Sequence, residues 1–299
     1  MQKYLNEKSL KKFNSKVAVL LAAHNGLEYI EKQILSIKKQ KDVFVKIFIS
    51  VDKSADGTYE WCKLFEKKNS YLEVLPYGEY FGGAAKNFFR LIKDVNFEEF
   101  DYVALSDQDD LWMDNKLSYA LKKIWELNCD AVSSDVLAFW KNGNENLVKK
   151  SWPQKKYDFL FESAGPGCTY VFKSSKLLLF KNFMISNWNQ INKISLHDWI
   201  IYAYFRSKKF IWHIDAVPLI KYRQHENNDT GANYGLRAYL KRIFLIKNNW
   251  YRNEVTKICD LVEFKMKINY FFRIKNFWQL RRRPRDTIVI LLISIFCLY

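Results

Sequence analysis

The sequence predicts an α/β fold with a Rossmann-like, mostly parallel central sheet and helices on both of its faces. In the first half, apolar runs of strand length alternate with segments whose apolar residues recur at helical spacing. Polar and acidic residues follow these strand-like runs, and open parallel sheets bind ligands at the C-terminal ends of their strands. The 299 residues, 49% of them hydrophobic, are enough to bury a large core.

The first strand, helix and strand are read from residues 17–51. Residues 17–22 form a continuous apolar run, and the polar turn at 23–26 follows it. Apolar residues then recur at helical spacing over 29–37, and 45–51 reads as a second strand. Two strands joined by a helix predict parallel pairing.

The next elements continue the alternation. A turn at 52–58 starts a second helix, and 72–75 is a short third strand. Gly82-Gly83 precedes a helix that carries Lys86 in its first turn. Residues 102–105 read as a fourth, buried strand, and a helix with apolar positions from Leu117 to Ile124 comes after the acidic segment that follows it.

The second half alternates less cleanly. We expect strands at 131–138 and 167–172, helices at 176–183 and 196–205, and strands at 210–214 and 218–222 that pair with each other. From Leu236 the chain becomes basic and aromatic. The sequence therefore predicts a main domain over residues 1–235 and a basic, helical C-terminal extension over 236–299.

Composition limits the classes of partner. The net charge of +16 favours polyanions, which include nucleic acid, anionic lipid and phosphate-bearing substrates. The five cysteines are scattered without a C-x-x-C pair, so we expect free thiols in a reducing compartment. The polar N-terminus does not read as a signal peptide, which favours a cytoplasmic location. The apolar run at 288–299 is shorter than the ~20 residues of a membrane span, so we expect an interfacial anchor or a docked helix.

Three carboxylates lie within Asp107-Gln108-Asp109-Asp110, directly after the fourth predicted strand. Alternate aspartates can direct two oxygens at one Mg²⁺ or Mn²⁺, and such ions usually complete their coordination with phosphates and water. A metal-bound diphosphate is the substrate this pattern favours. Aspartate clusters are also common in turns and helix caps, and the short pattern alone leaves both interpretations open.

Taken together and in order, these motifs resemble inverting nucleotide-sugar glycosyltransferases of the GT-A fold, similar to glycosyltransferase family 2. The S-D-Q-D-D form of the acidic segment resembles bacterial rhamnosyltransferases of surface-polysaccharide synthesis in particular. The resemblance covers roughly residues 16–235. It implies donor contacts in residues 16–115 and acceptor contacts in 116–235. Val51 and Lys53 depart from the family pattern, which usually has Asp and Gly there.

The resemblance also implies roles for single residues. In the family, the end of the first strand contacts the nucleotide, the acid after the second strand reads the base, and a D-x-D motif assists the metal and diphosphate. The implied donor-binding residues are Ala22, Ala23, His24, Asp52, Lys86 and Asp107. The implied divalent-cation ligands, for Mg²⁺ or Mn²⁺, are Asp107, Asp109 and His225, the last within the segment 222–228 that looks like a family signature. The implied general base is Asp198, within Leu196-His197-Asp198-Trp199.

The implied reaction moves rhamnose or another hexose from a nucleoside-diphosphate donor to a saccharide or lipid-linked acceptor. Capsule, O-antigen and cell-wall polysaccharide are the pathways in which such members act. Arg281-Arg282-Arg283 precedes the apolar end, and basic residues near an anionic membrane surface contribute ~1 kcal/mol each. We therefore expect a cytoplasmic protein that associates peripherally with the inner face of the membrane.

Other interpretations remain at this stage. Asp52 and Asp56 can be turn residues, and Asp198 can be a helix N-cap. A nucleotidyltransferase shares the acidic metal chemistry, although it usually carries a Gly-rich phosphate loop that residues 23–26 match poorly. A basic nucleic-acid-binding protein would explain the charge. Nucleic acid is not the expected partner, because the acidic cluster would repel a phosphate backbone.

Overall fold

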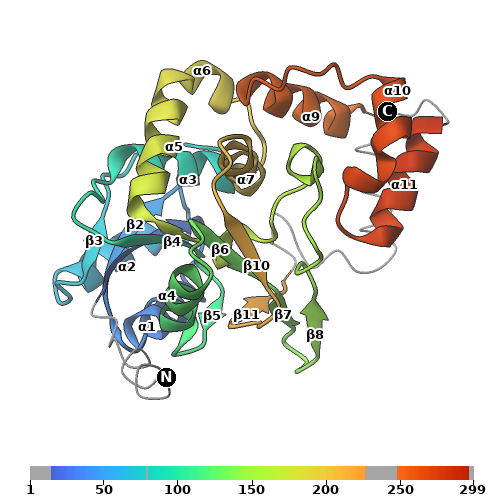
Figure 1. Cartoon of the computed structure of the whole chain (residues 1–299). Helices are drawn as coiled ribbons and strands as arrows, with labels where there is room; N and C mark the ends of the chain where they lie inside the picture. The colour runs from blue at the N-terminus through green and yellow to red at the C-terminus, as the bar shows by residue number, and fades with distance from the viewer. Residues whose placement is uncertain (1–14, 79, 226–247, 296–299) are drawn as a thin grey trace, which may run out of the picture.

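In the computed structural model, which describes residues 15–78, 80–225 and 248–295, a seven-stranded sheet runs through the centre of the molecule (Figure 1). Its order is β10-β6-β9-β4-β1-β2-β3, and β9 is the strand that pairs antiparallel with both neighbours. The fold class expected from the sequence is confirmed. The strands of this sheet are β1 Ser15–Ala23, β2 Val43–Val51, β3 Leu72–Val74, β4 Tyr102–Asp107, β6 Ala131–Ser134, β9 Val171–Lys173 and β10 Trp212–Asp215.

Helices cover both faces of this sheet. The alternating side chains of β1 explain why: Val17, Val19 and Leu21 join one core, while Ala18, Leu20 and Ala22 join the other. On the first face lie α1 Ile30–Lys38, α2 Thr58–Glu66 and α4 Lys116–Glu126. On the second lie α3 Ala84–Asp94, α5 Ser174–Ser186, α6 Trp188–Ile191 and α7 His197–Ser207.

A second, four-stranded sheet stands beside the C-terminal ends of the first. Its order is β5-β11-β7-β8, with β5 Leu111–Trp112, β7 Val136–Phe139, β8 Glu145–Val148 and β11 Ile220–Arg223. The predicted single strand at 131–138 is therefore wrong, because the chain leaves β6 at the buried Asp135 and enters the second sheet as β7. At 167–172, a short 3₁₀ turn occupies Gly167–Thr169 before β9 begins.

The expected pairing of residues 210–214 with 218–222 is also wrong. β10 pairs in parallel with β6, whereas β11 pairs with β5 and β7 of the second sheet. The Asp215 carboxylate accepts a hydrogen bond from the Val217 backbone N–H at 2.8 Å, which closes a local turn between the two strands. That turn redirects the chain from one sheet to the other instead of forming a hairpin.

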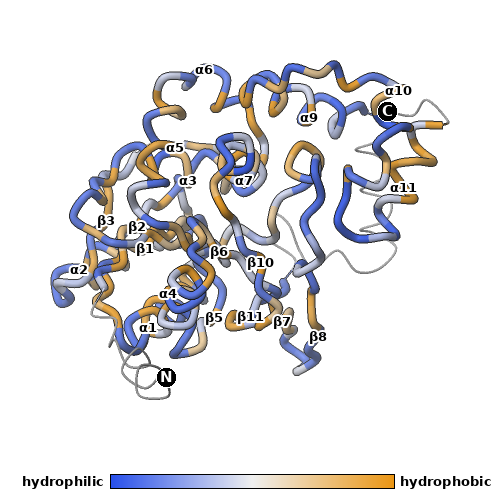
Figure 2. The backbone as a smooth tube through the Cα atoms, in the orientation of Figure 1, coloured by the Kyte–Doolittle hydropathy of each residue, from blue (hydrophilic) through white to orange (hydrophobic). Residues whose placement is uncertain are grey.

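The described C-terminal residues fold as helices that pack on the main domain. They are α9 Trp250–Leu261, α10 Tyr270–Asn276 and α11 Pro284–Ile295. Val255, Ile258, Leu261, Leu280 and Ile290 are buried in the same core as α3, α5 and α7. The boundary expected at residue 235, like residues 296–299 of the apolar run, lies outside the described residues. Figure 2 shows that α11 is hydrophobic toward its C-terminal end. Within the described ranges, no helix is long and apolar enough to cross a membrane.

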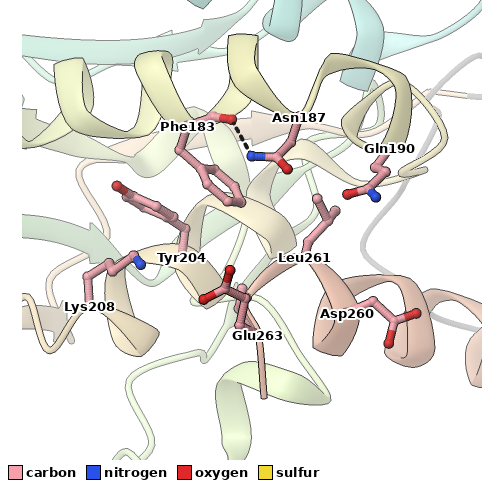
Figure 3. Close-up of a pocket in the computed structure, with 9 residues that line it drawn as sticks. Phe183, Asn187, Gln190, Tyr204, Lys208, Asp260, Leu261 and Glu263 are labelled. Carbon is pink, nitrogen blue, oxygen red and sulfur yellow. Dashed lines mark hydrogen bonds between the residues drawn. The ribbon is translucent and has the colours of Figure 1, made fainter. Parts of the chain in front are cut away.

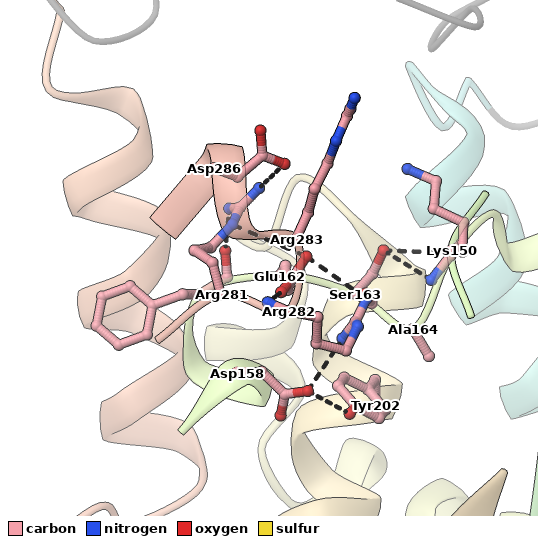
Figure 4. Close-up of polar contacts among 12 residues, drawn as sticks. Lys150, Asp158, Glu162, Ser163, Ala164, Tyr202, Arg281, Arg282, Arg283 and Asp286 are labelled. Carbon is pink, nitrogen blue, oxygen red and sulfur yellow. Dashed lines mark hydrogen bonds and ion pairs between the residues drawn. The ribbon is translucent and has the colours of Figure 1, made fainter. Parts of the chain in front are cut away.

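The expected membrane contact of Arg281 and Arg282 does not fit their positions. The Arg282 side chain is 2% exposed and its Nη1 lies 3.2 Å from Asp158 Oδ2 (Figure 4). The same carboxylate also pairs with Arg206. Arg281 donates to the Phe161 carbonyl at 2.7 Å. Arg283 is exposed. Two of the three arginines therefore stabilise the docking of the C-terminal helices rather than face lipid.

We expect Arg282→Met to lower the free energy of unfolding by about 3 kcal/mol, because it leaves the buried Asp158 carboxylate short of a partner. The neighbouring substitution Arg283→Met is the matched control and should change it by less than about 0.5 kcal/mol. Urea unfolding of both variants measures the difference. Equal stability of the two variants would contradict the buried ion pair.

Candidate active site

The C-terminal ends of the central strands bring several predicted residues together. Ala22 at the end of β1 is in register with Ser50 of β2 on one side and Asp107 of β4 on the other. The Asp52 backbone N–H donates to the Ala23 carbonyl at 2.8 Å. Ala22, Ala23, Asp52 and Asp107 thus lie along one edge of the sheet, as the sequence predicted for parallel strands.

Gln108, between the two aspartates, ties this edge together. Its Oε1 accepts from the His24 backbone N–H at 2.7 Å, and its Nε2 donates to the His24 carbonyl at 2.7 Å. A Cβ on Gly26 would lie 2.0 Å from Gln108 Oε1, so any other residue there would displace this amide from its present position. The His24 side chain itself is exposed. The sequence analysis missed Gln108, although its place within the acidic segment was a signal.

Asp52 is 3% exposed, and its carboxylate is occupied by backbone donors. It accepts from the N–H groups of Lys53 at 2.7 Å, Phe81 at 2.8 Å and Gly82 at 3.0 Å. The side chain therefore anchors the loop that leads into α3. Asp56 makes a local turn by accepting from the Thr58 N–H at 3.0 Å, and it joins this turn to the segment after β1 by accepting from the Leu27 N–H at 3.0 Å. In this conformation the Asp52 carboxylate could bind a nucleotide base only after its hydrogen bonds to the loop at Phe81-Gly82 break.

The first turns of α3 also meet the strand ends. Lys86 is exposed there. The next residue, Asn87, is buried, and its Nδ2 donates to the carbonyls of Ala23 at 3.2 Å and Ser50 at 3.0 Å. Arg90 donates to Ser50 Oγ at 3.0 Å. The sequence analysis missed Asn87 and Arg90, although a polar residue on the apolar side of a helix is a recognisable signal.

His225 reaches the acidic segment from the end of β11. Its Nε2 lies 2.7 Å from Asp109 Oδ2, and its ring stacks on Tyr29 with centroids 5.2 Å apart. Arg223, two residues earlier, donates from Nε to the Asp109 carbonyl at 2.9 Å. The second sheet therefore brings a late part of the chain to the D-x-D segment. The end of the signature, residues 226–228, lies outside the described residues.

The donor set suits a hard divalent cation. A geometric group of Asp107, Asp110 and Cys168 has ligand atoms within 4.8 Å of one another. Asp110 and Cys168 are fully buried, and burial raises the pKa of each well above its usual value. Mg²⁺ and Mn²⁺ prefer ionised oxygen ligands, with imidazole tolerated by Mn²⁺. Of the ligands expected from the sequence, Asp107 belongs to this geometric group, whereas Asp109 and His225 face each other at 2.7 Å.

Asp198 lies in the first turn of α7. The N-cap of this helix is Leu196 and makes no side-chain capping bond, while Asp198 Oδ1 accepts from the following backbone N–H, that of Trp199, at 2.8 Å. Burial raises the pKa of Asp198 to about 6, against the opposing effects of a Ser163 hydrogen bond, the Trp199 N–H and the Lys150 charge. A carboxylate with this pKa can exchange a proton near neutrality.

The structure connects Asp198 with the central strands. The Tyr170 hydroxyl lies 3.4 Å from the Asp198 carbonyl, and the Tyr170 carbonyl accepts from the Leu105 N–H of β4 at 3.1 Å. The preceding residue, His197, stacks on Phe88 of α3 at 4.1 Å. Burial lowers the pKa of His197 to about 3, so it remains neutral and acts in packing.

A surface pocket of about 280 Å³ lies between α5, α7 and the end of α9, away from these residues (Figure 3). Phe183, Tyr204 and Leu261 form its apolar wall, and Lys208, Asp260 and Glu263 its charged rim. It contains none of the predicted site residues. The strand ends and the start of α7, rather than this pocket, form the candidate active site.

Comparison with known proteins assigns the family. Residues 18–184 match the family model described as glycosyl transferase family 2. The chain is also 44% identical over 289 residues to the dTDP-rhamnosyl transferase RfbG of Shigella flexneri, covering 93% of this chain and 100% of the relative. The chain belongs to glycosyl transferase family 2. It is therefore a glycosyltransferase, rather than the nucleotidyltransferase or nucleic-acid-binding protein also considered from the sequence.

Other similarities agree with this assignment. The UDP-Glc:alpha-D-GlcNAc-diphosphoundecaprenol beta-1,3-glucosyltransferase WfgD of Escherichia coli is 27% identical over 163 residues, which are 54% of this chain and 61% of the relative. Among solved structures, TarS 1-349 of S. aureus in complex with UDP has a TM-score of 0.52 at 15% identity, covering 94% of this chain and 81% of that one. The mannosyltransferase PcManGT of Pyrobaculum calidifontis, in complex with GDP-Man and Mn2+, has a TM-score of 0.52 at 13% identity, with coverages of 96% and 86%. These structures confirm the expected GT-A fold.

If His225 is the metal ligand expected from the sequence, we expect His225→Ala to weaken Mn²⁺ binding by roughly 10- to 100-fold, because it removes both that ligand and the group that pairs with Asp109. Free Mn²⁺ measured by electron paramagnetic resonance gives the affinity. The control is His213→Ala, because His213 pairs with Asp215 within β10 and should not affect the ion. Unchanged Mn²⁺ affinity in the His225 variant would remove this residue from the metal site.

Proposed function

We propose that this glycosyltransferase transfers rhamnose from dTDP-rhamnose to a saccharide or lipid-linked saccharide acceptor, with inversion at the anomeric carbon. The observation that carries the proposal is the 44% identity to a dTDP-rhamnosyl transferase along that relative's whole length. The lipid-linked acceptor class draws support from the relative named for a diphosphoundecaprenol acceptor. Surface-polysaccharide synthesis is the process in which such a transfer belongs.

The proposed donor site is the strand edge formed by residues 16–115. Ala22, His24, Asp52 and Lys86 are the candidates for nucleotide contacts, with Asp52 available once the loop at Phe81-Gly82 is released. Asp107, Asp109 and His225 would hold the divalent cation, Mg²⁺ or Mn²⁺. When bound, such a cation neutralises the negative charge that develops on a leaving diphosphate.

The proposed acceptor site lies in residues 116–235, at the start of α7. Asp198 accepts the proton of the acceptor hydroxyl while that oxygen attacks the anomeric carbon from the face opposite the nucleotide. The bond from the anomeric carbon to the diphosphate breaks as the new glycosidic bond forms, so one displacement inverts the configuration. Since burial raises the pKa of Asp198 to about 6, the base is ionised above that pH and protonated below it.

We expect Asp198→Asn to lower acceptor turnover by ~10² to 10⁴, because the amide keeps the shape but cannot take a proton. Donor affinity should change little. In the wild type, activity should fall as the pH drops below about 6, because Asp198 becomes protonated there. Acceptor-dependent release of dTDP, followed across pH beside a donor titration, measures all three quantities. Near-normal turnover of the variant would end the assignment of Asp198 as base.

We further propose peripheral association with the cytoplasmic face of the membrane through α10, the turn after it and α11. Apolar side chains are exposed along this surface: Phe271 at 76%, Trp278 and Ile288 at 50% each, and Leu292 and Ile295 at 47% each. Arg283 and Arg285 are exposed at the start of α11. Aromatic and aliphatic residues beside basic ones are the combination that binds an anionic interface. The proposed membrane contact therefore rests on these exposed apolar residues with Arg283 and Arg285, and no longer on Arg281 and Arg282.

Replacing Ile288 and Leu292 together by serine should reduce co-sedimentation with anionic liposomes at least about threefold, because it removes apolar area from the interface. Leu64→Ser is the matched control, because Leu64 on α2 is 61% exposed on another part of the surface. Full retention of liposome binding by the double variant, or equal loss in the control, would contradict this surface.

A further inference from the structure

The helix that carries Asp198 begins without a side-chain cap. Its N-cap, Leu196, makes no capping bond, and the first hydrogen bond within the helix, from the Ile200 N–H to the Leu196 carbonyl, is 3.4 Å long. Helix N-termini usually depend on a side-chain acceptor for their free N–H groups. The start of α7 therefore depends on contacts from other elements.

The first of these contacts comes from Glu254 of α9, which is 1% exposed. Its Oε2 accepts from the Ser195 N–H at 3.0 Å. Its Oε1 accepts from Lys257 Nζ at 2.6 Å, and that ammonium also donates to the Lys193 carbonyl at 2.9 Å. Both oxygens of this buried carboxylate are hydrogen-bonded, and together they attach the segment before Asp198 to α9.

The second contact lies on the other side of Asp198. The next residue, Trp199, is 3% exposed, and its ring stacks on Tyr251 of α9 with centroids 5.6 Å apart and an angle of 25° between the planes. Trp199 Nε1 donates to the Phe159 carbonyl at 3.0 Å, and the Tyr251 hydroxyl donates to the Phe161 carbonyl at 2.6 Å. Both side chains are thus anchored to one short segment of the main domain.

The two contacts lie on either side of Asp198 along the chain. Ser195 and Trp199 are about one helical turn apart, and α9 contacts both of them. Asp198 lies between them and remains partly exposed. The backbone around the proposed base is therefore held by a helix from the C-terminal part of the chain.

We propose that Glu254 and Tyr251 are positioning residues for sugar transfer, which hold the turn on both sides of Asp198 so that its carboxylate meets the acceptor hydroxyl. This inference rests on the proposed role of Asp198 as the base. Neither positioning residue gives or takes a proton during the transfer. A misplacement of about 1 Å can lower a rate by ~10²-fold, because proton transfer requires hydrogen-bond distance. The helix α9 thus contributes to catalysis as well as to the packing of the C-terminal helices.

The test compares the full-length wild type with Glu254→Ala, Glu254→Gln, Tyr251→Leu and the control Asp260→Ala. Asp260 is an exposed acid on the same helix. Acceptor-dependent release of dTDP gives kcat and the acceptor KM. Calorimetric titration with dTDP-rhamnose gives the donor affinity and the number of donor sites per chain. Dividing kcat by that number removes unfolded chains from the comparison.

We expect Glu254→Ala and Tyr251→Leu to lower kcat per donor site by ~10- to 100-fold, with donor affinity unchanged because the proposed donor site lies at the strand ends. Glu254→Gln keeps an oxygen for the Ser195 N–H and should retain most of the activity. Asp260→Ala should match the wild type. Amide hydrogen exchange, measured without substrates, should become faster over residues 193–201 in Glu254→Ala and stay unchanged in the central strands.

A kcat per donor site equal to that of the wild type in Glu254→Ala or Tyr251→Leu would overturn the proposal. An equal loss in Asp260→Ala or in Glu254→Gln would also overturn it, because the effect would then not come from the bond to the turn. Unchanged exchange over residues 193–201 in Glu254→Ala would show that α9 does not hold this turn, and would overturn it as well.

Asp198→Asn in the same assay keeps this inference apart from the proposed function. Normal turnover of Asp198→Asn would end the assignment of the base. A loss in Asp198→Asn together with normal turnover in Glu254→Ala would overturn only the positioning role. If the wild type transfers no rhamnose, the proposed substrate fails, while hydrogen exchange still decides whether Glu254 holds the turn.

Discussion

The joining of the C-terminal ends of β1 and β4 is the constraint on which the rest of the site depends. Gln108 makes two hydrogen bonds of 2.7 Å with the backbone of His24, and Gly26 leaves the space for its amide. Because the flanking residues are Asp107 and Asp109, this amide also fixes where the two carboxylates leave the strand. One segment therefore joins the ends of the two strands and carries the acids proposed to bind the metal and the diphosphate.

Two parts of the chain far apart in sequence are brought to this edge by different means. The second sheet delivers His225 to Asp109 at 2.7 Å, with Arg223 bonded to the Asp109 backbone. The antiparallel strand β9 and Tyr170 connect the start of α7, and so Asp198, to β4. The C-terminal helices are attached to this part of the domain by the ion pair between Arg282 and the buried Asp158. The proposed donor and acceptor sites thus belong to one connected framework.

The sequence predicted the first half well because its information is local. Apolar residues recur there at strand spacing and at helical spacing in turn. Parallel strands also place the residues that follow Ala22 and Asp107 at the same edge of the sheet. What it missed depends on tertiary partners. Gln108, Asn87 and Asp135 form hydrogen bonds with backbone groups of other segments. The spacing of apolar residues along the sequence does not predict such bonds. The sequence suggests that Arg281 and Arg282 are surface charges, because their partners are distant in sequence. Arg282 pairs with the buried Asp158, and Arg281 donates to the Phe161 carbonyl.

Calorimetric titration of the wild type with dTDP-rhamnose, in Mn²⁺ and again in excess chelator, tests most directly the claim that this edge is a metal-assisted nucleotide-sugar site. The account predicts binding in Mn²⁺ that weakens at least about tenfold in chelator, because the carboxylates then repel the unscreened diphosphate. It also predicts weaker binding of UDP-glucose and GDP-mannose under the same conditions. Equal affinity with and without the metal, or no binding of dTDP-rhamnose while another nucleotide sugar binds, would contradict it.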